Sequence, residues 1–171
     1  MKFKRSSGIL MHITSLPGPD GIGDLGAEAY QWVNTLADMG CNLWQVLPLG
    51  PTGYADSPYQ CFSAFAGNPY LINPVMLWED GLLTREEVAD RPAFPADYVD
   101  YGPVIDHKVK LLDLAYTRFK GMKGTELYEE YKQFKDEESW WLNDFALFMA
   151  IKEVHGLASW REWKWPLKVR D

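Results

Sequence analysis

Residues 43–74 read LWQVLPLGPTGYADSPYQCFSAFAGNPYLINP. The apolar run from Leu43 to Leu49 predicts a buried strand, and the stretch from Pro51 to Pro74 combines five aromatic residues with Gly, Pro, Ser and Asn. That mixture suits neither a long helix nor a plain strand, so we expect a long loop. Such loops usually carry function, and ligand-binding loops of parallel α/β folds follow the carboxyl ends of strands.

The sequence before this loop predicts a βαβ unit. Gly8 to Ile13 is a continuously apolar run, typical of a strand buried on both faces. Apolar residues at helical spacing predict a helix from Leu25 to Met39, with Asp24 as its N-terminal cap and Gly40 at its end. Asn42 to Leu47 is the second strand, parallel to the first. Two parallel strands do not make a stable sheet, and the rest of the chain predicts no third strand.

The remaining sequence is predicted to be helical. Caps and apolar spacing indicate five helices: Pro74 to Glu79, one opened by the capping box Thr84-Arg85-Glu86-Glu87 and broken at residues 91–95, about Pro103 to Phe119, Thr125 to Glu137, and Trp140 to His155, capped by Ser139 and closed by Gly156.

Composition narrows the class of partner. The 171-residue chain carries a net charge of −7, with 17 Lys+Arg against 24 Asp+Glu, and lacks the basic run of a nucleic-acid site. Aromatic residues make up 15% of it, and their flat apolar faces with polar edges suit sugar rings. Cys41 and Cys61 have no metal-ligand spacing, which favours a reduced pair over a disulfide. No apolar stretch suits a signal peptide or a membrane span, so we expect a cytoplasmic protein.

Several catalytic and cofactor motifs fit poorly. Gly21 to Gly26 reads GxGxxG, but seven residues separate it from the strand and no ribose-binding acid follows the second strand, which favours turn glycines over a dinucleotide site. His12 could line a pocket or be satisfied in the core, and no histidine sits in a metal-ligand motif. Asp56 is the only acid in the aromatic loop, so the carboxylate pair of a glycosidase is incomplete.

The order of seven stretches closely resembles the amino-terminal part of amylomaltases, the 4-α-glucanotransferases of glycoside hydrolase family 77, also called disproportionating enzymes. The resemblance covers nearly all of the chain and is weakest between Leu82 and Ala96 and after Ala158. The matching stretches are Leu10–Pro17 (LMHITSLP), Gly21–Gly26 (GIGDLG), Trp44–Tyr54 (WQVLPLGPTGY), Asp56–Gln60 (DSPYQ), Ser63–Ile72 (SAFAGNPYLI), Val99–Gly102 (VDYG) and Trp141–Met149 (WLNDFALFM).

The resemblance implies an α/β fold, the first two strands of a (β/α)8 TIM barrel plus a largely helical insertion after the second strand. A full barrel needs about 250 residues, so the barrel in this chain would be incomplete. The implied division is 1–50 for the first βαβ unit, 51–74 for the aromatic loop, 75–137 for the helical insertion, and 138–171 for a helix returning to the barrel and a Trp-rich tail. The family's catalytic aspartate, glutamate and further aspartate come from later strands, so we assign no catalytic residue here.

The resemblance also implies substrate contacts. Ser57 and Tyr59 match positions that touch glucose units near the cleaved bond, and Tyr54 and Tyr101 match tyrosines that carry a longer glucan at a second site. Asp56 could contact sugar or tie the loop by accepting backbone N–H bonds. For each residue the alternative is that it only packs the loop.

The implied reaction is retaining transfer of α-1,4-glucan segments between maltooligosaccharides, without metal or organic cofactor. The partners would be α-1,4-glucans, with neither nucleic acid nor membrane involved. We expect the chain alone to be inactive, because the acids are missing. The alternative is a non-catalytic glucan-binding remnant.

Overall fold

The computed structural model describes residues 5–170, apart from the side chain of Tyr54. The chain forms two compact units, one ending at Lys123 and the other beginning at Gly124. This boundary falls inside the predicted 75–137 insertion. The four-part division drawn from the family resemblance stays a prediction.

The first unit contains the predicted βαβ arrangement. Strand β1 (Gly8–Leu10) pairs in parallel with β2 (Leu43–Gln45), and helix α1 (Ala27–Asp38) connects them, which confirms the prediction. Both strands are shorter than expected, and β1 ends early because the chain soon turns into a 3-10 helix, η1 (Ile13–Ser15). Gly8 is required at the pairing, since a Cβ there would lie 2.5 Å from the carbonyl oxygen of Leu43.

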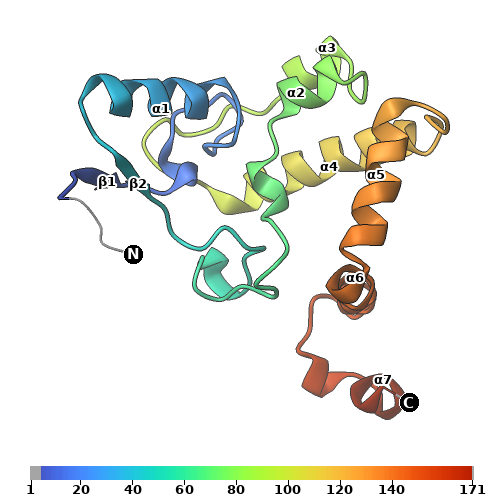
Figure 1. Ribbon diagram of the computed structural model, residues 1–171. Coiled ribbons are helices and arrows are strands. Elements are labelled where there is room, and N and C mark those ends of the chain that lie inside the picture. Colours follow the sequence, from blue (N-terminus) through green and yellow to red (C-terminus); the bar gives the residue numbers. More distant parts are fainter. Residues whose placement is uncertain (1–4, 171) are drawn as a thin grey trace. The chain divides into compact units, whose positions relative to one another are not determined.

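The expectation that the strands are buried on both faces is wrong. Leu10 is 59% exposed and Leu43 is 56% exposed, because within residues 5–170 the sheet has only these two strands. Helix α1 lies along one side of the strand pair (Figure 1), where an apolar cluster forms the core. That cluster consists of Ile13, Leu16, Ala29 and Leu71, with the partly buried Met11, Trp32, Trp44 and Val46 against it.

The predicted cap of α1 is wrong at one end and confirmed at the other. Gly26 is the N-cap residue, while the Asp24 carboxylate turns inward and accepts from the Gly26 N–H at 3.0 Å. At the carboxyl end Gly40 has a φ of 72°, the left-handed conformation that glycine adopts without steric cost.

Three further helices complete the first unit: α2 (Pro74–Glu79), α3 (Arg85–Ala89) and α4 (Tyr101–Phe119). The capping box of α3 is confirmed, since the Glu87 N–H donates to Thr84 Oγ1 at 3.2 Å and the Thr84 N–H donates to Glu87 Oε2 at 2.8 Å. Residues 91–95 form no regular element, as their prolines predict. Helix α4 begins slightly earlier than predicted, and its first residue is Tyr101.

The second unit consists of α5 (Glu126–Glu137), α6 (Ser139–Val154), the 3-10 helix η4 (Trp160–Glu162) and α7 (Trp165–Val169). The prediction that Ser139 caps α6 is wrong, because Ser139 is already helical and its hydroxyl donates to the Asp136 carbonyl at 2.8 Å. Gly156, with a φ of 62°, closes α6 as predicted. Among the described helices none is long and apolar enough to cross a membrane.

Candidate functional site

The aromatic loop is closed by its own hydrogen bonds into a stem and a tip. Thr52 and Cys61 form an isolated antiparallel bridge, and the Phe62 N–H donates to the Pro51 carbonyl at 3.2 Å. Further down, the Asn68 N–H donates to the Leu49 carbonyl at 2.7 Å. These bonds pair residues 49–52 with residues 61–68, so residues 53–60 form the tip of the loop.

The tip has an unusual backbone. Ala55 and Asp56, in the 3-10 helix η2 (Tyr54–Asp56), have φ values of 54° and 51°. Non-glycine residues seldom adopt this left-handed conformation, and where they do, the strained positions cluster at functional sites. The turn that follows is held by the Ser57 hydroxyl, which accepts from the Tyr59 N–H at 3.3 Å.

The predicted sugar-contacting residues differ in accessibility. The Tyr59 side chain is 72% exposed at the tip, and Ser57 is partly buried. The side chain of Tyr54 lies outside the described residues. Asp56 and Tyr101 are both partly buried, and Tyr101 reaches this region from the first turn of α4.

Asp56 and Tyr101 belong to one polar cluster beyond the carboxyl ends of β1 and β2. Burial raises the pKa of the Tyr101 phenol, a hydrogen bond with the Thr14 side chain lowers it, and the Asp56 charge raises it again. Burial and then the Asp56 charge likewise raise the pKa of Tyr70, and burial raises the pKa of Asp56 itself. The structure thus brings the predicted Asp56 and Tyr101 together with Tyr70 and Thr14, which sequence reasoning missed.

His12 lies close to the carboxyl end of β1. It is half-buried, burial lowers its pKa, and its Nδ1 atom has no hydrogen-bond partner among the described residues. Within the described part of the chain this ring nitrogen is buried as well as unpartnered, so His12 is not a satisfied core histidine, and no pocket position follows from it. Metal binding gains no support, since the described residues include no group of three His, Cys, Asp or Glu placed to hold an ion.

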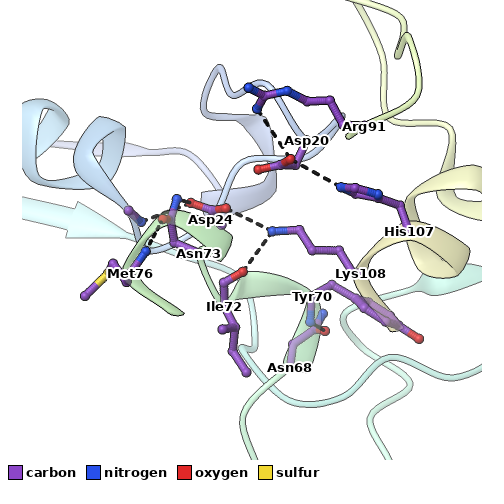
Figure 2. Close-up of polar contacts among 11 residues, drawn as sticks. Asp20, Asp24, Asn68, Tyr70, Ile72, Asn73, Met76, Arg91, His107 and Lys108 are labelled. Atoms are coloured by element: carbon purple, nitrogen blue, oxygen red, sulfur yellow. Dashed lines mark hydrogen bonds and ion pairs between the residues drawn. The ribbon is translucent and has the colours of Figure 1, made fainter. Parts of the chain in front are cut away.

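A buried polar network anchors the return of the loop (Figure 2). The Lys108 side chain, from α4, is 1% exposed, and its Nζ donates to Asp24 Oδ2 at 3.0 Å and to the Ile72 carbonyl at 2.8 Å. Asn73 Nδ2 donates to Asp24 Oδ1 at 2.8 Å, and Asn73 Oδ1 caps α2 by accepting from the Met76 N–H at 3.1 Å. We call Asp24, Asn73 and Lys108 the clamp.

A second buried charge lies beside the clamp. Asp20 is 1% exposed, with His107 Nε2 at 3.4 Å and Arg91 Nη1 at 3.6 Å from its Oδ1. Buried carboxylates are costly without such partners. Asp20 therefore lies at ion-pair distance from α4 and from the segment after α3, while neither of its carboxylate oxygens has a hydrogen-bond partner among the described residues.

The clamp was missed at the sequence level, although one signal was present. Lys108 lies at helical spacing from Val104, Leu111 and Ala115, all of which are buried. A lysine inside an apolar stripe is almost never fully buried unless it is paired. The pattern therefore called for a partner, but nothing local indicated that Asp24, 84 residues away, provides it.

Comparison with known proteins places this arrangement in a family. A family profile described as 4-alpha-glucanotransferase matches residues 11–171. The chain belongs to this family. The family resemblance carried by the sequence motifs is thereby confirmed.

Curated 4-alpha-glucanotransferases are similar in sequence to this chain over nearly its whole length. It is 48% identical over 171 residues to a 4-alpha-glucanotransferase of Thermus thermophilus, covering 100% of this chain and 33% of the relative. It is 46% identical to a 4-alpha-glucanotransferase of Synechocystis sp., covering 98% of this chain and 33% of that relative. The chain therefore spans about a third of the length of the curated relatives it matches.

A solved amylomaltase structure has a similar fold over most of this chain. The amylomaltase from Streptococcus agalactiae in complex with acarbose superposes with a TM-score of 0.87 at 40% identity, covering 94% of this chain and 32% of that one. The parallel strand pair and the helices that follow it thus have the arrangement found in part of an amylomaltase.

Proposed function

We propose that this chain is the amino-terminal part of a 4-α-glucanotransferase, in which β1 and β2 are the first two strands of a (β/α)8 barrel. The family match over residues 11–171, which spans a third of each relative, is the observation that carries the proposal. The exposed Leu10 and Leu43 support it, because further strands and helices would cover them. A cytoplasmic location is part of the proposal, supported by the free thiols of Cys41 and Cys61.

The reaction would be retaining transfer of an α-1,4-glucan segment. A carboxylate attacks the anomeric carbon, a second acid protonates the departing sugar oxygen, and the glycosyl group then passes to an acceptor hydroxyl in place of water. The buried carboxylates of this chain are unsuited to either step, since Asp24 is held by three donors and Asp20 faces His107 and Arg91. We therefore assign the chemistry to acids outside these 171 residues.

The aromatic loop would bind the glucan. The exposed ring of Tyr59 is available to stack on the apolar face of a sugar, and Tyr54 and Tyr101 would carry a longer glucan at a second site. Ser57 would contact a glucose unit through its hydroxyl. The Asp56 charge raises the pKa of the phenols of Tyr70 and Tyr101, which supports a role in orienting those rings over direct contact with sugar.

A maltotriose assay tests the proposal. The full-length protein that carries this chain should convert maltotriose into glucose and longer maltodextrins, whereas the 171-residue chain alone should produce neither. Both preparations should be free of host enzyme, with extract from cells lacking the gene as the control. Products from the 171-residue chain would overturn the assignment of the acids, and an inactive full-length protein would overturn the proposed activity.

A non-catalytic glucan-binding module is the second candidate. It is favoured by the surroundings of Asp20 and Asp24, the buried carboxylates among the described residues. Asp20 has His107 and Arg91 at ion-pair distance, and Asp24 accepts from Lys108 and Asn73. The reading frame separates the candidates. Under the enzyme proposal it continues past Asp171 into strands that carry the acids, and a stop codon there would favour the binding module.

A further inference from the structure

Helix α4 contacts the return of the aromatic loop through Lys108 and carries Tyr101 in its first turn. Tyr101 and Lys108 are seven residues apart, which is about two helical turns, so both project from the same side of α4. Lys108 binds the Ile72 carbonyl where the loop returns, and Tyr101 lies close enough to the tip for the Asp56 charge to raise the pKa of its phenol. Helix α4 therefore fixes the spacing between Tyr101 and Lys108, whose amino group holds the base of the loop.

We propose that Lys108 and Asp24 are positioning residues, which hold α4 in register with the loop and thereby set the spacing between Tyr101 and the tip. The proposal rests on the proposed function, because that spacing matters only if the two regions grip one glucan. Neither Lys108 nor Asp24 touches the sugar. Their effect passes through Tyr101 and Asp56.

The contacts of Lys108 fix one register. Its Nζ reaches a carboxylate and a backbone carbonyl at once, at 3.0 Å from Asp24 Oδ2 and 2.8 Å from the Ile72 oxygen. A slip of α4 by one turn would move Nζ by about 5.4 Å and break both bonds. Apolar packing alone tolerates such shifts better, because its contacts are non-directional.

Asp24 links Lys108 on α4 to Asn73 at the end of the loop. Its Oδ1 accepts from Asn73, which caps α2, so the end of the loop cannot move without uncapping that helix. The packing around this contact is tight, since a Cβ on Gly26 would lie 2.1 Å from Asn73 Nδ2. Hence Lys108 and Asn73 hold the loop's return from two directions through one carboxylate.

A merely stabilising role makes a different prediction. Replacing both members of a buried ion pair by neutral residues of similar volume is often neutral or stabilising, whereas removing one member leaves a buried charge alone. If the pair only stabilised the fold, the double replacement would therefore restore stability and glucan binding together. If it sets register, the double replacement restores stability but not binding.

The experiment compares Lys108→Met with the double variant Lys108→Met/Asp24→Asn in the full-length protein. The matched control is Lys110→Met on the same helix, because the Lys110 side chain is 61% exposed and pairs with the exposed Asp90. The measurements are the melting temperature, the Kd for maltoheptaose by calorimetry, and amide hydrogen exchange at residues 53–60.

We expect the double variant to melt close to the wild type, to bind maltoheptaose at least about 10-fold more weakly, and to exchange the tip amides faster, because small misplacements of a binding group cost large factors. Lys110→Met should match the wild type in all three measurements. Wild-type affinity and wild-type tip exchange in the double variant would overturn the proposal. Loss of cooperative melting in the double variant would also overturn it, since the pair would then serve folding itself.

Failure of the proposed function has a separate signature. In that case the wild-type protein binds no maltoheptaose. Tip exchange in the double variant still decides whether Lys108 and Asp24 hold the loop.

Discussion

The tip of the aromatic loop and the clamp at its base differ in almost every physical respect. At the tip, the Tyr59 ring is exposed and two successive residues, Ala55 and Asp56, have left-handed backbone conformations. At the base, Asp24 and Lys108 are buried and each makes more than one directional contact. The loop therefore joins an exposed, locally strained end to a base fixed by buried polar bonds.

This contrast indicates a division of labour. Ligand-binding segments are drawn from the less stable parts of a fold, whereas the groups that hold them must be over-determined by their surroundings. Removing one partner of the clamp should therefore cost stability, whereas substitutions at the tip should cost affinity with little change in stability. Substitutions at Lys108 and Tyr59 test this separation directly, and two further tests address the packing after β1 and the Glu87–Arg118 pair.

The largest effect is expected for Lys108→Met. It leaves the Asp24 carboxylate buried without its cation, which typically costs about 3–5 kcal/mol of unfolding free energy. Urea unfolding of the full-length protein, followed by fluorescence of its tryptophans, measures the loss. Lys110→Met should stay within about 0.5 kcal/mol of the wild type. Equal stability of the two variants would show that the clamp is not a stabilising contact.

Gly23→Ala tests the packing of the loop after β1, which carries Asp20 and Asp24. An added Cβ would lie 2.1 Å from the Ile13 carbonyl oxygen and 2.7 Å from the Leu16 nitrogen, both backbone atoms. Overpacking of this kind costs about 1–3 kcal/mol. At Gly67 a Cβ would meet nothing within 4 Å, so Gly67→Ala is the matched control. Thermal melts in which Gly23→Ala and Gly67→Ala coincide would contradict the tight approach at Gly23.

Tyr59→Ala should separate binding from stability. The exposed ring makes a small contribution to the fold, so the unfolding free energy should change by no more than about 0.5 kcal/mol. Loss of a stacking surface should raise the Kd for maltoheptaose about 10-fold, which corresponds to about 1.4 kcal/mol. Tyr30→Ala, at an exposed tyrosine of α1, should change neither quantity. An unaltered Kd in Tyr59→Ala would remove Tyr59 from the glucan site.

The smallest effect is expected at Glu87, which pairs with Arg118 on α4 near the surface. Hydrogen bonds from the Arg118 side chain and then from the Thr84 N–H lower the pKa of Glu87 from 4.5 to about 2. The folded-state pKa lies below the unfolded one, so this stabilisation is present above about pH 4.5 and is lost as the pH falls toward 2. Unfolding midpoints measured from pH 6 to pH 3 should fall less steeply in Glu87→Gln and in Arg118→Met. If the unfolding midpoints of both variants fell with pH as steeply as those of the wild type, the Glu87–Arg118 pair would not stabilise the fold.

The sequence predicted local structure well where local interactions decide it. The bounds of α2 and the Thr84 capping box are confirmed because the Asn73 side chain and the Thr84/Glu87 pair satisfy nearby N–H groups, and Pro74 at the start of α2 has no N–H to satisfy. The same local rule predicted Asp24 as the N-cap of α1, but the N-cap residue is Gly26. The Asp24 carboxylate instead meets Lys108 from a helix 84 residues later, and sequence spacing carries no information on that pairing.

Strand burial and the set of residues that share the site could not be predicted either, because both depend on contacts between distant segments of the chain. The sequence identified Gly8 to Ile13 and Leu43 to Leu49 as strand regions, but burial depends on neighbouring strands, and residues 5–170 contain only the two. Asp56 and Tyr101 were named from motifs in separate segments. That they share a cluster with Thr14 and Tyr70 depends on how α4 packs against the loops, which only the folded chain specifies.

Hydrogen exchange of the full-length protein with and without saturating maltoheptaose tests the central claim most directly. The account predicts that bound glucan slows exchange at the amides of residues 53–60, while the amides of residues 24–26 and 71–73 exchange slowly in both states because the clamp is already fixed. Unchanged exchange at the tip under saturation, or protection that develops only at the base, would contradict it.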